Sequence, residues 1–142
     1  MSIHRQTIAL RNDLAEIPRL AKSFDAFCAP LVPTPKDVHA LHLALEEAVI
    51  NVINHGYADG QSHTFTVELA AVDRRVTVIV TDDAPAYNPL ARAEVDVTLP
   101  LEDRPIGGLG VHLVKKLMDS ARYERRDGRN ILTLVRTLAP TT

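Results

Sequence analysis

The sequence predicts a two-layer α/β sandwich, in which a mixed, mostly antiparallel sheet carries helices on one face. The sheet is predicted by two pairs of strand-like segments, each joined by a tight turn as in antiparallel hairpins. The helical layer is predicted by segments with apolar residues at helical spacing, which separate the strands. At 142 residues the chain can build one substantial core. We therefore expect a single domain over residues 1–142.

The chain begins with a predicted strand and a surface helix. Residues 3–10 partly alternate between apolar and polar side chains, as in a strand. Asn12 or Asp13 can cap the helix that follows, and Pro30 closes it. The apolar residues of this helix recur at helical spacing and predict packing on one side only: Leu14, Ile17, Leu20, Phe24 and Phe27.

The longest predicted element is a second helix. It begins with Thr34 as N-cap and Pro35 at the first helical position, and it ends at the His55-Gly56 pair. Residues 63–71 and 75–82 then predict a hairpin that turns at Asp73-Arg74. Nearly all of the second strand is β-branched, which is typical of a buried central strand.

The last third of the chain predicts a lid, a helix and a hairpin. Residues 84–106 contain four prolines and no sustained period, and we expect a functional lid there. Helical spacing resumes over 108–119. Residues 120–126 and 129–138 flank the tight turn Asp127-Gly128 as a final hairpin.

Composition excludes several classes of protein. Sixteen basic and eighteen acidic residues give a formal charge of −2, which favours neither nucleic acid nor an anionic membrane as a partner. No apolar stretch is long enough to span a membrane, and the first residues lack the apolar run of a signal peptide. The lone Cys28 excludes an internal disulfide and a cysteine-based zinc cluster. A cytoplasmic location is the default expectation.

A polar stripe interrupts the apolar second helix. Glu47, Asn51, Asn54 and His55 stand at positions i, i+4, i+7 and i+8, which share one face of a helix. The residues around them are so apolar that most of this helix must be buried. A buried carboxylate without partners costs several kcal/mol. We therefore expect the stripe to lie against a wet polar cavity, although a satisfied core network or a solvent groove also fits the pattern.

Two further motifs point to a ligand. Asp82 ends a buried strand beside the proline-rich segment, where ligands meet a rigid scaffold, but an isolated aspartate there also fits a simple turn. Glycines 107, 108 and 110 directly precede a helix, so backbone N–H groups could approach an anion. The spacing matches neither the dinucleotide fingerprint nor a P-loop.

Together these motifs resemble the Bergerat-fold ATP-binding superfamily of gyrase, heat-shock chaperone, histidine-kinase and mismatch-repair ATPases. Within it, EEAVINVINHGY, DDAPAYNPL and RPIGGLGVHLVKKLMD resemble the stand-alone anti-sigma-factor serine/threonine kinases. The resemblance extends from about residue 8 to 136. It implies that the whole chain is one histidine-kinase-like ATP-binding domain that binds ATP or ADP with Mg²⁺.

The resemblance also implies a role for individual residues. Asn51 would be a ligand of Mg²⁺, and Glu47, one turn earlier, would be the general base that positions a serine or threonine hydroxyl for attack on the γ-phosphate. Asp82 would accept a hydrogen bond from the adenine amino group. The remaining implied nucleotide-binding residues are Gly108 and Gly110 at the phosphates and Thr133, which would contact the adenine through water.

One position departs from the family pattern. The family has Asp-x-Gly where this chain has Ala84, in the nucleotide-binding box that begins with Asp82. If the family glycine uses a positive φ or lies close to the base, a methyl group there reduces affinity. We expect weaker binding and not its loss.

The implied function is an anti-sigma factor and protein kinase. It would hold a sigma factor, phosphorylate a STAS-type anti-anti-sigma antagonist on serine or threonine, and form a homodimer. The alternative is a non-catalytic switch, in which nucleotide orders the lid and changes the affinity for a regulatory protein. A third interpretation, which Ala84 also permits, is a fold that has lost nucleotide binding.

Overall fold

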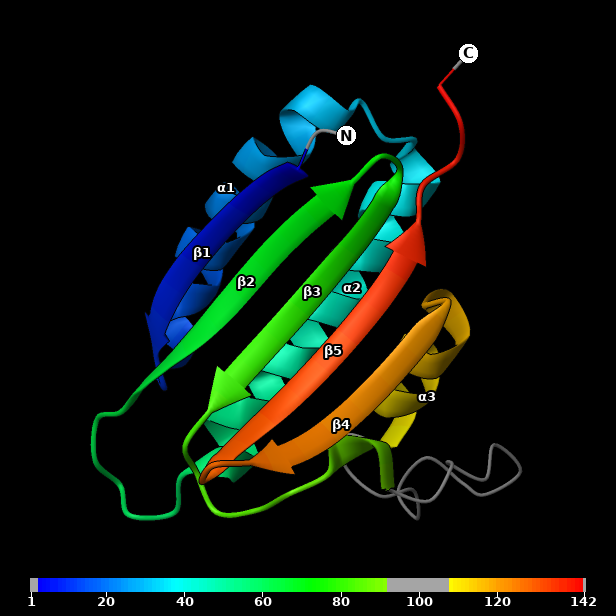
Figure 1. Ribbon diagram of the computed structural model, residues 1–142. Coiled ribbons are helices and arrows are strands. Elements are labelled where there is room, and N and C mark those ends of the chain that lie inside the picture. The colour runs from blue at the N-terminus through cyan, green and yellow to red at the C-terminus, as the bar shows by residue number, and fades with distance from the viewer. Residues whose placement is uncertain (1–2, 92–107, 142) are drawn as a thin grey trace.

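Five antiparallel strands form a single sheet in the computed structural model, which describes residues 3–91 and 108–141 (Figure 1). The order across the sheet is β1-β2-β3-β5-β4. The strands are β1 (Ile3–Arg11), β2 (Thr64–Val72), β3 (Arg75–Asp82), β4 (Ser120–Arg126) and β5 (Arg129–Thr137). The predicted fold class is confirmed, and every pairing between the described strands is antiparallel.

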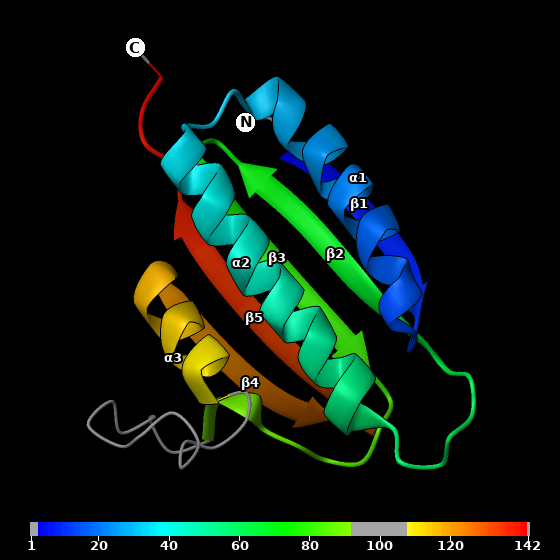
Figure 2. The ribbon, with the colours of Figure 1, turned by 180° about the vertical axis from the view of Figure 1, so that it is seen from behind.

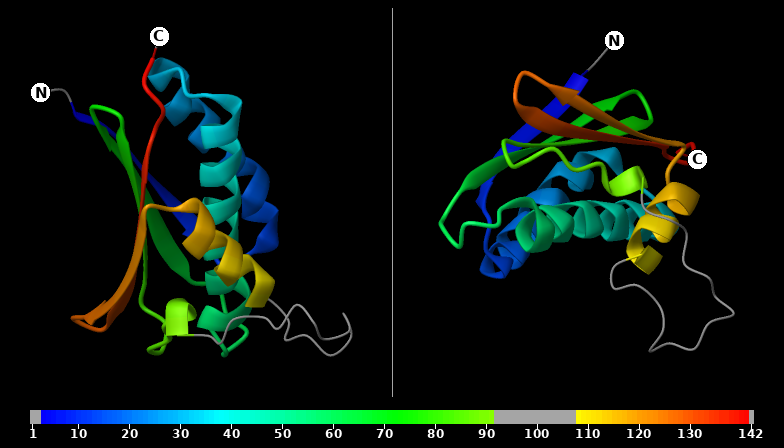
Figure 3. Two further views of the ribbon diagram at one scale, coloured as in Figure 1. Left: turned by 90° about the vertical axis from the view of Figure 1, so that its right-hand side faces the viewer. Right: turned by 90° about the horizontal axis from the view of Figure 1, so that it is seen from below.

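Three helices lie together on one face of the sheet, as Figures 2 and 3 show. They are α1 (Ile17–Cys28), α2 (Pro35–Asn51) and α3 (Gly108–Leu117). The core lies between the two layers, because alternate side chains of β2 and β3 are buried toward the helices. No described helix covers the other face (Figure 3). None of the described helices is long and apolar enough to cross a membrane.

The predicted helix starts are present. Asp13 accepts a hydrogen bond from the Ala15 N–H at 2.9 Å and so begins a short 3-10 turn, Leu14–Glu16, that leads into α1. Thr34 accepts one from the Asp37 N–H at 3.1 Å at the start of α2. One side of α2 is buried against the sheet. Its buried apolar residues are all 3% exposed or less: Ala40, Leu41, Ala44, Leu45, Ala48 and Val49.

The end of α2 corrects the prediction of a single polar stripe. The regular helix ends at Asn51, and residues Val52–Gly56 form a π-helical turn. This wider turn rotates the side chains that follow it. Asn54 and His55 are exposed, whereas Glu47 and Asn51 are half-buried. The four residues therefore do not line one cavity.

The two tight turns occur where they were predicted. Asp73 between β2 and β3 has a φ of 57°, and Asp127 and Gly128 between β4 and β5 have φ values of 54° and 76°. Aspartate and glycine tolerate this left-handed region better than most residues. The pairing of β3 with β5 joins more distant parts of the chain, and it places Asp82 directly opposite Asn130.

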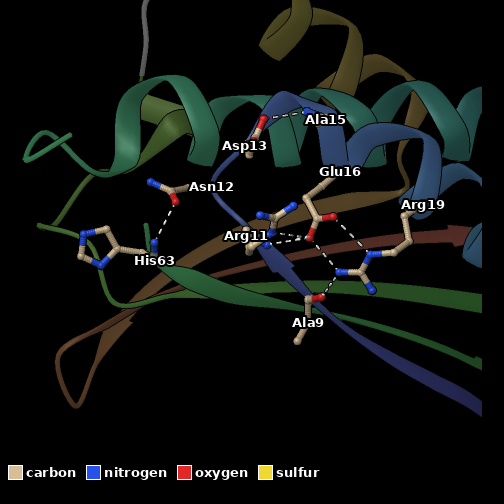
Figure 4. A network of polar contacts seen from close by, with 8 residues as sticks. All are labelled: Ala9, Arg11, Asn12, Asp13, Ala15, Glu16, Arg19 and His63. Atoms are coloured by element: carbon tan, nitrogen blue, oxygen red, sulfur yellow. Dashed lines mark hydrogen bonds and ion pairs between the residues drawn. The ribbon is translucent and has the colours of Figure 1, made fainter. Parts of the chain in front are cut away.

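A network of polar contacts joins β1 to the start of α1 (Figure 4). Glu16 is 6% exposed, and its Oε2 accepts hydrogen bonds from the Arg11 N–H at 2.9 Å and from the Arg19 guanidinium at 2.7 Å. Its Oε1 accepts from Arg19 Nε at 3.2 Å. These bonds, first the one from Arg19 and then the one from Arg11, lower the pKa of Glu16 to about 2.

The predicted lid is described only in part. Residues 84–91 follow β3 and include a 3-10 turn, Pro89–Ala91. Residues 92–106 of the predicted lid lie outside the described residues.

Candidate functional site

A pocket lies at the edge of the two layers where β3 ends, β5 begins and α2 gives way to its π turn. The space free of protein atoms, counted out to its mouth, is about 390 Å³. It brings together Asn51 and Asp82, two of the residues predicted to bind nucleotide. Its walls are mostly apolar or aromatic: Ala48, Asn51, Val52, Gly56, Val80, Asp82, Tyr87, Pro89, Tyr123, Asn130 and Leu132.

Among the described residues of this wall Asp82 supplies the carboxylate, and its described partners contact one of its two oxygens. The residue is 8% exposed. Its Oδ1 accepts hydrogen bonds from the Ala84 N–H at 3.0 Å and from Asn130 Nδ2 at 2.8 Å. Within residues 3–91 and 108–141, Oδ2 has no hydrogen-bond donor and no cation pairs with the carboxylate. A buried acceptor left free in an apolar pocket is a site for a ligand N–H group.

Asn130 is the site residue that the sequence reasoning missed. It stands two residues after the Asp127-Gly128 turn and is 6% exposed. Its importance depends on the register of β5 against β3, which joins residues 48 positions apart. One weak signal in the sequence is an asparagine placed directly before the apolar and β-branched run 131–135.

Thr133 does not line the pocket. It pairs with Ile79 of β3 and alternates along β5 with the buried residues Leu132 and Leu134. Because successive side chains of a strand point to opposite faces, Thr133 lies on the face away from the helices. Asn130 and Leu132 are the residues of β5 in this wall, and the role of Thr133 behind the adenine, through water, stays a prediction that this placement does not favour.

Glu47 and Asn51 lie one turn apart on α2. Asn51 lines the pocket and also a small apolar cavity beside it, under Val114 of α3. The Glu47 carboxylate has no hydrogen bond or ion pair to another described residue. Burial, and then the neighbouring charge of Glu46, raises the pKa of Glu47. A carboxylate that is poorly solvated and unpaired is a stronger base than an exposed one.

Ala84 shows neither of the two features expected to weaken binding. Its φ is not positive, and it is absent from the pocket wall. The residue is 1% exposed, and a Cβ built on Gly56 would lie 3.5 Å from its methyl carbon. The methyl group therefore packs beside Gly56. The role of Ala84 in nucleotide binding stays a prediction, and so do the alternatives that rest on it.

Gly108 and Gly110 lie in the first turn of α3, and Gly108 is its first residue. The first backbone N–H groups of a helix have no partner within it, and they favour anions. The position therefore agrees with phosphate binding, which stays a prediction for both glycines.

Comparison with known proteins gives a consistent family match. The model of the histidine kinase-like ATPase domain matches residues 10–136. A serine/threonine-protein kinase of Bordetella bronchiseptica, BtrW, is 32% identical over 100 residues, which are 70% of each chain. The serine-protein kinase RsbW of Halalkalibacterium halodurans is 28% identical over 126 residues, 86% of this chain and 75% of that relative. An anti-sigma F factor of Clostridium novyi is 28% identical over 109 residues, 75% of this chain and 76% of the relative.

A solved structure supports the fold. The crystal structure of the RsbU and RsbW domains of Rv1364c from Mycobacterium tuberculosis superimposes with a TM-score of 0.70 at 20% identity. The alignment covers 96% of this chain but only 33% of that longer one.

Proposed function

This chain belongs to the histidine kinase-like ATPase domain family, in the group of anti-sigma-factor kinases, and from that premise we propose how its pocket works. The pocket binds ATP with its adenine ring against Asp82. The protein then transfers the γ-phosphate to a serine or threonine of a protein antagonist.

The free oxygen of Asp82 is the observation that carries this proposal. An adenine ring is flat and apolar on its faces, as the wall of the pocket is. Its exocyclic amino group is a hydrogen-bond donor, and Asp82 Oδ2 is a buried acceptor without a donor among the described residues. Guanine carries an acceptor oxygen at the corresponding position, which a carboxylate repels. Adenine is therefore the preferred base.

Glu47 is the proposed general base. A phosphoryl transfer to a hydroxyl needs an acceptor for the hydroxyl proton and alignment of the attacking oxygen. Glu47 lies one turn from Asn51 on α2, outside the wall around Asp82, so it can serve the phosphate end of the nucleotide. Its raised pKa favours proton acceptance. The proton moves from the attacking hydroxyl to a Glu47 carboxylate oxygen.

Asn51 is the proposed protein ligand of Mg²⁺. Its side-chain amide lines the pocket and has no hydrogen bond to another described residue, so its oxygen is available to a hard cation. The described residues contain no cluster of three or more His, Cys, Asp or Glu side chains that could hold a metal. Most ligands would therefore be phosphate oxygens and water. Bound Mg²⁺ supplies neutralisation of the phosphate charge.

The partners are proposed from the relatives. By analogy with the anti-sigma F factor and the RsbW kinases, the protein binds a sigma factor and phosphorylates a STAS-type anti-anti-sigma protein. We also propose that it acts in the cytoplasm as a homodimer. Membranes and nucleic acid have no part in this scheme.

The first test is calorimetric titration with ATP and ADP, with and without Mg²⁺. We expect magnesium-dependent binding that Asn51→Ala weakens. Absence of binding at millimolar nucleotide would overturn the proposed function.

The second test is transfer of labelled γ-phosphate from ATP to a recombinant STAS-type antagonist. Glu47→Gln should lower the rate by about 10²–10⁴-fold with ATP binding retained, which is the usual contribution of a general base. Glu46→Gln is the matched control, because Glu46 is the adjacent carboxylate and pairs with His42 at 3.6 Å. Its rate at neutral pH should stay within about threefold of wild type, since Glu46 pairs with His42 and has no proposed part in the transfer. Transfer that survives Glu47→Gln would exclude Glu47 as the base.

A further inference from the structure

The amide of Asn130 uses all of its hydrogen-bonding groups inside the protein. Its Oδ1 accepts from the Tyr87 N–H at 3.2 Å and from the Tyr123 hydroxyl. Its Nδ2 donates to Asp82 Oδ1 at 2.8 Å, to the Pro85 carbonyl at 3.1 Å and to the Ala84 carbonyl at 3.3 Å. Two N–H bonds and two lone pairs are the full capacity of this side chain.

These partners fix the orientation of the amide. The two groups on the Oδ1 side are donors, and the three groups on the Nδ2 side are acceptors. A flipped amide would place its oxygen against a carboxylate and two carbonyls, which is strongly unfavourable. Since no polar group of Asn130 is left over, it has none to offer a ligand, although it lies in the pocket wall.

We propose that Asn130 is a positioning residue that sets nucleobase selectivity through Asp82. By donating to Oδ1, Asn130 and the Ala84 N–H hold the carboxylate so that Oδ2 stays free for the amino group of the base. The inference rests on the proposed ATP binding. It adds that Asn130 affects selectivity for the base without making a polar contact to it.

The same amide connects three separate parts of the pocket wall. Tyr123 belongs to β4, Tyr87 belongs to the loop after β3, and both line the pocket. Arg125 of β4 adds a hydrogen bond to the Ala84 carbonyl at 2.7 Å. Asn130 therefore holds the loop, the edge strand and the selective carboxylate in one arrangement before ligand binds, which avoids an ordering cost on binding.

At position 130 only an amide side chain can donate to Asp82 and the two carbonyls and also accept from Tyr87 and Tyr123. Leucine would leave Asp82 Oδ1 with one donor, would remove the Asn130 donor of the Pro85 carbonyl, and would leave the Ala84 carbonyl with Arg125 as its described donor. Aspartate would place a second carboxylate within hydrogen-bonding distance of the first, and such a pair holds one proton between them. In Asn130→Asp, that shared proton can replace the N–H donor, but it is lost as pH rises.

The first arm of the test is a pH profile of ATP binding by Asn130→Asp, with wild type at each pH as the reference. The other charged or titratable side chains that the structure describes at this end include Tyr57, Asp83, Tyr87, Tyr123, Arg125, Asp127 and Arg129, and they are the same in both proteins. We expect the affinity of the variant, relative to wild type, to fall by at least about tenfold between about pH 6 and pH 9. A loss that is the same at every pH would indicate a merely structural role and would overturn the inference.

The second arm compares ATP with purine riboside triphosphate, which lacks the amino group. Wild type should favour ATP by at least about tenfold, as for a hydrogen bond to a charged acceptor. In Asn130→Leu the preference should fall to about threefold or less, with an intermediate value in Tyr123→Phe. Tyr57→Phe is the matched control. It removes a hydroxyl bonded to Asp83 at 2.6 Å, outside this pocket, and should leave the preference unchanged.

Each outcome has one meaning. A folded Asn130→Leu or Tyr123→Phe that keeps the full preference overturns the positioning role while ATP binding stands. Wild type that binds both nucleotides equally also overturns it, since Asp82 then reads no amino group. Wild type that binds neither overturns the proposed function and the inference with it. If Asn130→Leu does not fold, Tyr123→Phe and the pH profile of Asn130→Asp decide.

Discussion

Asp37 and Asp82 are buried aspartates at opposite ends of the same two-layer domain, and they use their oxygens differently. Asp37 is 4% exposed, and its Oδ1 receives Arg136 Nε and Nη2, both at 3.0 Å. Its Oδ2 accepts from the Ala139 N–H at 2.9 Å. Asp82 has no cation among its described neighbours, and both of its donors converge on one oxygen.

The difference separates a structural carboxylate from one built for a ligand. A fully paired buried charge holds two segments together, as Asp37 joins α2 to the end of β5 and the chain beyond it. A buried carboxylate with one unpaired oxygen can still accept a hydrogen bond from a ligand or from water. Glu16 belongs with Asp37, because Arg11 and Arg19 satisfy both of its oxygens (Figure 4).

Breaking the structural pair should have the largest effect on stability. Arg136→Met leaves the Asp37 charge buried without its cation, and we expect the free energy of unfolding to fall by about 3–5 kcal/mol. The affinity for ATP in the folded protein should change by less than about threefold, because Arg136 and Asn130 are six residues apart on β5, or about 20 Å. Urea unfolding and calorimetry measure the two quantities.

The control for this variant is Arg122→Met. Arg122 is an exposed arginine on β4, and its replacement should change the free energy of unfolding by about 0.5 kcal/mol or less. Equal losses in the two variants would show that the buried pair contributes nothing beyond a surface arginine.

Asp82→Asn should weaken ATP binding without lowering stability, which is the opposite of the effect expected for Arg136→Met. We expect the affinity for ATP to fall by about 10–100-fold, since the bond to a charged acceptor is worth about 1.5–3 kcal/mol. The free energy of unfolding without ligand should not fall, because the substitution removes a buried charge that has no cation among the described residues. Asp83→Asn is the neighbouring control, and its affinity should match wild type. If Asp82→Asn destabilises the protein as Arg136→Met does, the two aspartates do not differ in the proposed way.

The pH dependence of phosphotransfer tests Glu47, at the proposed phosphate end of the nucleotide. Glu47 accepts a proton only when ionised, so the rate should fall as pH decreases through its pKa. Because burial and the charge of Glu46 raise the pKa of Glu47, the fall should begin at a higher pH than for an ordinary glutamate, whose pKa is about 4.3. Glu46→Gln removes the second cause and should move the fall toward lower pH. If Glu46→Gln does not change the pH at which the rate falls, a group other than Glu47 causes that fall.

The parts predicted from sequence were those fixed by local chemistry. Thr34 caps α2, and Asp127-Gly128 turns β4 into β5, because the required hydrogen bond or φ value involves residues close in sequence. Asp82 could likewise be placed at a strand end from the β-branched run before it. The ATPase family followed from several such local motifs taken in order, and the comparisons confirm it.

The parts missed depend on contacts between distant residues. The register of β3 against β5 decides that Asn130, and not Thr133, faces the pocket, and no local signal carries that register. The π turn after Asn51 is also not encoded by apolar periodicity, so an ideal helix placed Asn54 and His55 on the wrong face. Sequence patterns thus identified candidate functional residues more reliably than they predicted which of these residues lie in contact.

Ala84→Gly should have the smallest effect on binding. Because the Ala84 methyl group packs beside Gly56 and not in the pocket wall, the affinity for ATP should stay within about threefold of wild type. The free energy of unfolding should fall by about 1–2 kcal/mol, from the lost methyl burial and the greater backbone freedom of glycine. Ala48→Gly removes a methyl that does line the pocket, so it should change affinity as well as stability. A tenfold gain in affinity from Ala84→Gly would instead mean that the methyl obstructs the base, and a weakly binding, non-catalytic switch would then be the better description of this protein.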